Sequence, residues 1–302
     1  EVANGGTFRD RQSVFGDIIN SEPVRVGAPN FTYPDSWPSG SPENGHPYSA
    51  FVAANETRTP VVYVGANDGM MHGFDATDTS PPGGEEVLAY VPTPLYEKLP
   101  ELTEQDYDHR FFADGPMNYV DAFFEDGPSA EWRSVVIGNL RTGGRGVYAL
   151  DVTDPGDFDE SNAGDLALWE FTPDDDPDVG HVTGTVPIVR LENGEWAAIF
   201  GNGFNSGGSE EAVLFIVDVE DGSVIKKIST GAGPSDDPRS GSDRINGLAA
   251  PTVIDSDNDS IVDAVYAGDL FGNLWKFDIS GNNPSSWGIA TSGNKPLFEA
   301  RS

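Results

Sequence analysis

The sequence contains no cysteine, and this absence excludes several kinds of chemistry. Disulfide bonds, thiol nucleophiles and cysteine-ligated zinc or iron–sulfur centres all require cysteine. The absence leaves the cellular compartment open, because an exported protein need not use disulfides. The chain also lacks a run of about 18 apolar residues, so we expect no transmembrane segment. Its first six residues do not resemble a signal peptide, and we expect an export signal outside this sequence.

Lysine is scarce, and the charge is strongly one-sided. The 302 residues include 50 acidic and only 17 basic residues, five of them lysine, for a net charge of −33. Phosphate backbones and anionic lipids repel such a surface, so we expect no nucleic-acid partner and no anionic membrane partner. At high salt, screening over about 3 Å at 1 M removes the self-repulsion. We therefore hypothesise a halophilic source, which low-salt unfolding that calcium alone does not reverse would support.

What the chain does contain is typical of a β-rich protein. It has 36 Gly, 23 Pro, 17 Phe and 9 Tyr, spread over short apolar runs that alternate with turn residues. A hydrophobic content of 37% is enough for a core.

One segment recurs along the chain, and the recurrence predicts the fold. Residues 62–75 align without gaps on residues 265–278 and share Val, Tyr, two Gly, Phe and Asp. Two diverged copies occupy residues 136–151 and 199–218. Each copy ends in Asp and a turn, a strand-like run follows the turn, and another strand-like run that opens with proline precedes the copy.

Four strands per unit, repeated, are the signature of a β-propeller blade. We predict an all-β, irregular propeller of four-stranded antiparallel blades with long loop insertions. One domain covers 1–302, excised from a longer protein, with blades at 14–92, 113–173, 182–230 and 245–300. Whether four blades close a ring or form an arc of a larger propeller stays open. We expect the inserts at 30–58, 96–112 and 231–244 to be polar loops over the rim.

A nine-residue loop in the last unit has the spacing of a calcium site. Asp255, Asp257, Asp259 and Asp263 occupy positions 1, 3, 5 and 9, and the Ile261 carbonyl lies at position 7. Calcium takes about six to eight oxygen ligands, and carboxylates at alternate positions of a tight turn point inward together. The sequence therefore predicts that these five residues bind Ca²⁺, and the alternative is a solvated acidic turn.

The loop departs from a complete EF-hand in two places. Position 12 is Tyr266, where a bidentate Glu is required, and position 6 is Ser260, where Gly usually supplies a positive φ. The flanking residues favour strands, so we expect the loop to join the first two strands of the last blade.

Other motifs favour structural interpretations, and we expect no catalytic residues. The four histidines have no metal-ligand spacing. The glycine-rich residues 141–146 lack the Gly-Lys-Ser/Thr ending of a phosphate loop and indicate a hairpin. The acidic residues 174–178 indicate a solvated turn, because their carboxylates are consecutive. We expect four tryptophans to pack between blades: Trp132, Trp169, Trp196 and Trp275.

Several segments together resemble the C-terminal propeller domain of the PilY1/PilC family of type IV pilus proteins. They are residues 15–24, 112–116, 143–155, 200–206 and 266–278. The resemblance implies an exported propeller at the cell surface, associated with the pilus tip or outer membrane. It implies a role in pilus assembly, in opposing retraction, and in adhesion and twitching motility. It also implies a calcium site at the five residues above, and pilin or minor pilins as partners.

Two alternatives belong to other functional classes. The repeated segment is similar to that of quinoprotein-dehydrogenase-like propellers, but these enzymes characteristically carry a vicinal cysteine pair, which this chain lacks. A carbohydrate- or host-binding adhesin without a pilus role is the other alternative. A host or abiotic surface ligand would be bound through regions missing from this sequence.

Overall fold

The computed structural model describes residues 7–11, 13–79, 83–125, 130–239 and 241–300. The ends of the predicted 1–302 unit therefore lie outside the described residues. Within the described residues the chain forms four antiparallel sheets, and in each of them four strands are hydrogen-bonded in chain order. The prediction of an all-β fold made of four-stranded antiparallel sheets is confirmed, with a fifth short strand added to the last sheet.

The strands follow one another in chain order from sheet to sheet. The first sheet contains β1 (Val24–Val26), β2 (Val61–Gly65), β3 (Met71–Asp75) and β4 (Glu86–Tyr90). The second contains β5 (Met117–Phe124), β6 (Glu131–Asn139), β7 (Val147–Asp151) and β8 (Ala167–Phe171). The third contains β9 (Ile188–Arg190), β10 (Trp196–Gly201), β11 (Val213–Asp218) and β12 (Val224–Ser229). The fourth contains β13 (Thr252–Ile254), β14 (Ala264–Gly268), β15 (Asn273–Asp278), β16 (Gly288–Ile289) and β17 (Phe298–Glu299).

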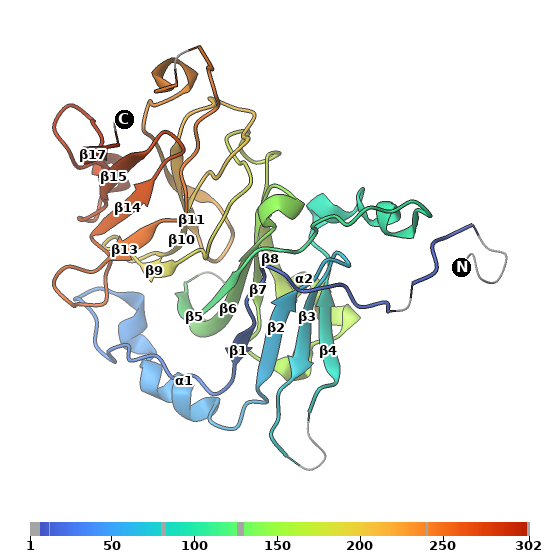
Figure 1. Ribbon diagram of the computed structural model, residues 1–302. Coiled ribbons are helices and arrows are strands. Elements are labelled where there is room, and N and C mark those ends of the chain that lie inside the picture. The colour runs from blue at the N-terminus through green and yellow to red at the C-terminus, as the bar shows by residue number, and fades with distance from the viewer. Residues whose placement is uncertain (1–6, 12, 80–82, 126–129, 240, 301–302) are drawn as a thin grey trace.

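Helices are short and lie in the connections. The α-helices are α1 (Tyr48–Ala54) and α2 (Ala163–Leu166). The 3₁₀ helices are Pro42–Gly45, Thr93–Leu95, Leu99–Thr103, Arg141–Gly143, Pro155–Asp157, Glu160–Asn162, Pro234–Asp236 and Pro284–Ser286. Among the described residues, no helix has the length and apolar character needed to cross a bilayer. Figure 1 shows the sheets side by side in chain order, with α1 in the connection between β1 and β2.

In the part of the chain that the structure describes, the core consists of three apolar layers, one between each pair of successive sheets. Tyr63 of the first sheet and Val136 of the second share one layer. Ile137, the next residue, lies in the layer shared with the third sheet. Ile199 of the third sheet packs with Phe277 of the fourth. Because successive side chains of a strand point to opposite faces, the two inner sheets are buried on both faces, and β6 and β10 therefore contain uninterrupted apolar runs.

At two places the second strand of a sheet ends in a glycine, followed closely by an asparagine, where the chain enters the next sheet. A Cβ on Gly65 would lie 2.1 Å from the Ala113 carbonyl oxygen, and one on Gly201 would lie 2.4 Å from that of Ala249. In both places the residues entering the next sheet cross directly over the strand end. Asn202 Oδ1 accepts a hydrogen bond of 2.8 Å from the Leu248 N–H across the same junction. Asn67 Oδ1 accepts one of 3.0 Å from the Phe112 N–H.

Aspartates close the turns that follow the third strands, as the repeat predicts. The Oδ1 atoms of Asp75 and Asp151 accept the N–H of the residue two positions later, at 2.7 and 2.9 Å. Asp278 does the same at 3.0 Å. These are Asx turns, in which the side chain replaces a backbone acceptor.

The expectation that residues 30–58 form a polar loop over the rim is wrong. This insert contributes Trp37 and Tyr48 to the same apolar layer as Trp132 and Trp196. Tyr48 and Phe51 of α1 have helical spacing, but the insert's aromatic residues form no longer period, so the sequence pattern did not indicate a buried face over the whole insert. Burial arises because the insert packs against the second and third sheets, which are distant in sequence.

Gly201→Ala should destabilise the protein by about 1–3 kcal/mol, because the added methyl group overpacks the junction with the Ala249 carbonyl. Gly288→Ala is the matched control, since a Cβ there meets no atom within 4 Å. Chemical denaturation of both variants measures the difference. Equal free energies of unfolding would contradict the close approach at Gly201.

Candidate functional site

The acidic loop joins β13 to β14, as its flanking residues predict. The Asp263 N–H donates to the Ile254 carbonyl at 2.9 Å and closes the base of the loop. Ile261 and Val262, near its end, are buried at 2% and 7% exposure. Ile261 packs in the layer between the second and third sheets, and Val262 in the layer between the third and fourth. The base of the loop is thus anchored, while Asp257 at its tip is exposed.

Three of the predicted ligands converge. One carboxylate oxygen from each of Asp255, Asp257 and Asp263 lies within 4.8 Å of the others. Asp255 accepts the N–H groups of Asn258 and Ser260 at 2.7 and 2.9 Å. Asp263 Oδ2 accepts the Ser256 N–H at 2.8 Å. Asp255 and Asp263 therefore hold the loop in its conformation by hydrogen-bonding its backbone N–H groups. This conformation places Asp257 next to them.

Ser260 takes the conformation that glycine usually supplies at position 6. Its φ is 73°, and that of Asn258 is 63°, so both residues are in the left-handed region. A non-glycine residue there costs about 1–3 kcal/mol, which the surrounding hydrogen bonds offset. The departure from the EF-hand pattern at Ser260 therefore does not prevent the sharp turn.

A fourth predicted carboxylate ligand is placed differently. Asp259 is not in the converging group of carboxylates. Its Oδ1 accepts the Ile261 N–H at 2.9 Å. The structure thus brings together Asp255, Asp257 and Asp263 but leaves Asp259 in a local turn.

The loop is under electrostatic strain from like charges. The pKa of Asp257 is raised above its ordinary value, mainly by the charge of Asp259, then by desolvation and by the charges of Asp263 and Asp255. A cation would relieve this repulsion. Converging carboxylates are hard oxygen donors, and they fit calcium or magnesium rather than a thiolate-seeking metal. The donor set therefore fits the predicted ion.

A second acidic group lines a pocket of about 170 Å³ where the second and third sheets meet. Its carboxylates are Glu125, Glu195, Asp218 and Glu220, beside Phe123 and Trp196. Within the described part of the chain, these carboxylates do not converge as the loop aspartates do. Burial, and then the charges of Glu220, Asp221 and Glu195, raise the pKa of Asp218 to about 7.

Three of the histidines, His72, His109 and His181, have polar partners outside the two acidic groups. His72 is buried, with Asp68 at 3.1 Å from Nε2 and Glu86 beside Nδ1. These hydrogen bonds outweigh desolvation and raise the pKa of His72. His109 contacts Asp17 at 2.9 Å, and Nδ1 of His181 lies 2.7 Å from the Arg141 carbonyl.

The expectation of a solvated turn at residues 174–178 is wrong for two of its carboxylates. Asp176 and Asp178 lie 2.8 and 2.7 Å from the Lys227 ammonium of β12. Asp178 is buried. Lys227 is about fifty residues away in sequence, so local spacing gave no signal of the pairing.

A buried ion pair that the sequence did not indicate lies beside the loop. Arg190 Nε of β9 donates to Glu43 Oε1 of the 30–58 insert at 2.7 Å. Both side chains are almost completely buried, at 2% and 0% exposure. Neither residue stands in a motif, and 147 positions separate them, so only the fold brings them together.

A family model and two curated relatives point to the same protein family. The family model described as the PilY1 beta-propeller domain matches residues 15–300. A type IV pilus biogenesis factor PilY1 homolog of Xylella fastidiosa is 44% identical over 309 aligned residues, covering 99% of this chain. The type IV pilus biogenesis factor PilY1 of Pseudomonas aeruginosa is 42% identical over 282 residues, covering 91% of this chain.

A solved structure is also similar. The crystal structure of the Pseudomonas aeruginosa PilY1 C-terminal domain superimposes with a TM-score of 0.67 at 37% identity, covering 84% of this chain. This chain spans 49% of that solved chain, and 20% and 22% of the two relatives above.

The raised pKa of Asp218 has a consequence for stability. A carboxyl whose pKa rises on folding contributes stability below its unfolded pKa of 3.8, and this stability is lost as the pH rises through about 7. Between pH 5 and pH 8 the wild type should therefore lose stability that the Asp218→Asn variant keeps. The free energy of unfolding of the variant minus that of the wild type should rise by about 1–2 kcal/mol over this range, after allowance for solvent screening.

Denaturant unfolding at both pH values tests this expectation. Asp278→Asn, which removes the exposed carboxylate of the equivalent turn, is the control. A pH-independent effect of Asp218→Asn would show that the pocket does not hold this carboxyl as described.

Proposed function

The chain belongs to the PilY1 β-propeller family, and from this premise we propose that it is a calcium-binding, non-enzymatic propeller region of a type IV pilus biogenesis protein. The observation that carries the calcium proposal is the convergence of Asp255, Asp257 and Asp263 in the β13–β14 loop. The names of the relatives carry the pilus proposal. Those names describe pilus biogenesis factors, which favours this function over a quinoprotein-like enzyme.

Calcium suits this loop better than magnesium. Calcium accepts flexible coordination by about six to eight oxygens, whereas magnesium demands near-ideal octahedral geometry and keeps several waters. The loop offers carboxylates on an exposed turn held by its own backbone hydrogen bonds, and the Ile261 carbonyl and Asp259 are the further predicted donors.

The residues of the loop have distinct tasks in this proposal. Asp255 and Asp263 hold the backbone, because each accepts at least two hydrogen bonds within the loop. Asp257 supplies charge at the exposed tip. When bound, the ion neutralises the carboxylates, and its binding free energy adds to the stability of the β13–β14 hairpin.

At the level of the whole protein, we propose a location at the cell surface, at the pilus tip or outer membrane. There the protein promotes pilus assembly, opposes retraction and supports adhesion and twitching motility, with pilin or minor pilins as partners. Because this chain spans about a fifth of its curated relatives, part of that activity belongs to regions outside this sequence.

Asp257→Asn should weaken calcium binding at least tenfold, because it removes one converging charge and leaves the hydrogen bonds of Asp255 and Asp263 in place. Titration calorimetry measures the affinity, and thermal unfolding measures the loss of calcium-dependent stabilisation. Asp174→Asn is the control, since it removes the same charge from an exposed turn outside the loop. Unchanged calcium affinity in Asp257→Asn would refute the ligand assignment.

The pilus role is tested in cells with the full-length protein. Asp257→Asn should change the number of surface pili and reduce twitching to below half of the wild-type rate, whereas Asp174→Asn should leave both unchanged. Electron microscopy of sheared pili and stab-agar assays give the two readouts. A deletion strain with normal piliation and twitching would overturn the pilus proposal, whatever the calcium affinity.

A further inference from the structure

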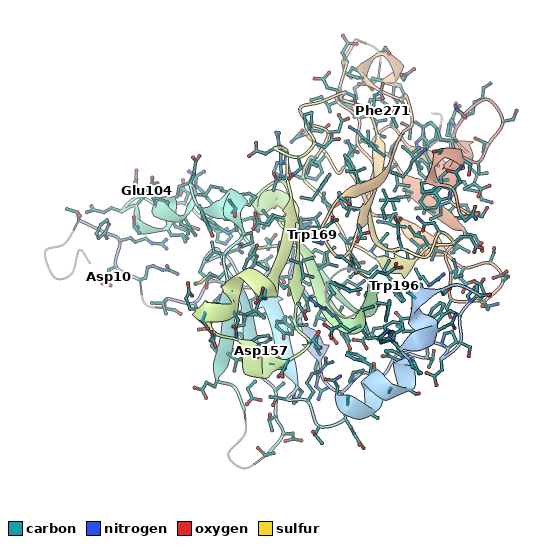
Figure 2. All side chains as sticks on the ribbon, turned by 180° about the vertical axis from the view of Figure 1, so that it is seen from behind. Asp10, Glu104, Asp157, Trp169, Trp196 and Phe271 are labelled. Atoms are coloured by element: carbon teal, nitrogen blue, oxygen red, sulfur yellow. The ribbon has the colours of Figure 1, made fainter. Side chains whose placement is uncertain are left out.

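The calcium loop and the 30–58 insert share one apolar layer. Ile261, at position 7 of the loop, is 2% exposed and belongs to the cluster that contains Trp37 and Tyr48 of the insert. Trp196 of β10 lies in the same cluster, with its ring centroid 6.2 Å from that of Trp37. Figure 2 places Trp196 beside the insert. A shift of Ile261 therefore changes packing that the insert also uses.

Arg190 forms a second, polar connection between the same two segments. Its backbone carbonyl accepts the N–H of Val262, the residue between Ile261 and Asp263, at 3.1 Å. Its side chain reaches the insert, where Nε donates to Glu43 Oε1 at 2.7 Å and Nη2 donates to Ser41 Oγ at 2.9 Å. The guanidinium carbon also lies 4.8 Å from the centre of the Trp37 ring.

These buried polar contacts hold the insert in addition to its apolar packing. Glu43 is completely buried, and Trp196 Nε1 also donates to its Oε1 at 3.2 Å. A buried carboxylate that loses its partner is strongly unfavourable, so Glu43 and Arg190 move together or not at all. The 3₁₀ turn Pro42–Gly45 is therefore fixed relative to β9, and β9 is fixed relative to the end of the loop.

From these contacts we propose that calcium binding in the 255–263 loop is coupled to the order of the 30–58 insert, and that Glu43 and Arg190 are the positioning residues that couple them. The inference rests on the proposed calcium site and assigns its regulation. The ion fixes the loop, the Ile261–Val262 segment keeps its place against β9, and Arg190 holds the insert. The 30–58 insert is thus better ordered when calcium is bound to the loop than when it is not.

Coupling of this kind is reciprocal. If the ion orders the insert, then loosening the insert lowers the affinity for the ion by the same factor. The coupling free energy can therefore be tested by two measurements. One follows the order of the insert in the wild type as calcium binds, and the other follows calcium affinity in variants of the insert.

The first measurement is amide hydrogen exchange of the wild-type protein with and without calcium. Exchange should slow at least threefold in peptides covering residues 35–55 as well as in the loop. Peptides covering residues 93–103, whose buried Leu95 and Leu102 belong to a different apolar layer, are the internal control. Protection confined to residues 252–268 would overturn the coupling, and this result needs no variant.

The second measurement is the calcium affinity of insert variants, taken well below their unfolding temperatures. Glu43→Gln should weaken calcium binding about fivefold or more, in the usual range of coupling between sites. Ser41→Ala, which removes one contact of Arg190, should weaken it by a smaller factor and supports the test if Glu43→Gln does not fold.

Asp35→Asn is the matched control, because Asp35 lies in the same insert and binds Ser49 rather than Arg190. Wild-type affinity in Glu43→Gln and Ser41→Ala would overturn the coupling and leave the calcium site standing. A wild-type protein that binds no calcium would instead overturn the proposed function itself.

Discussion

The close contact between successive sheets is the constraint on which the rest of the structure depends. Gly65 and Gly201 leave no room for a side chain where the chain enters the next sheet. Asn67 and Asn202 then hydrogen-bond the backbone that crosses there. Because these two junctions are fixed by contact and by hydrogen bonding, the apolar faces of the sheets that they join meet in register and form a layer between each joined pair. The acidic loop is positioned by the last of these layers, through Val262.

The acidic side chains are stabilised in two different ways. At turns, Asp75, Asp151 and Asp278 each use a carboxylate oxygen to accept a nearby N–H. Inside, Glu43 is paired with Arg190, because an unpaired charge there would be strongly destabilising. The loop carboxylates fall between these cases, since among the described residues no Lys or Arg pairs with them. A divalent cation is the chemistry that would balance them.

Sequence reasoning succeeded where the signal was local or repeated. The recurrence of residues 62–75 at 265–278 predicted antiparallel four-stranded sheets, because a repeated pattern of strand, glycine and turn specifies a repeated unit. The spacing of Asp255, Asp257 and Asp263 predicted their convergence, because alternate residues of a tight turn face the same way. It did not distinguish Asp259, whose carboxylate closes a turn with Ile261. That choice depends on the backbone path through Asn258 and Ser260, which spacing alone does not show.

The sequence by itself determined the strand order, the Asp-closed turns and the position of the acidic loop, since each follows from contacts between residues close along the chain. Only the tertiary structure decided that residues 30–58 are partly buried, that Arg190 meets Glu43, and that Lys227 meets Asp176 and Asp178. These contacts join residues about 50 to 150 positions apart, and their partners become neighbours only after the sheets have packed. Local pattern carries no information about such pairs, because their energy comes from burial that the folded sheets create.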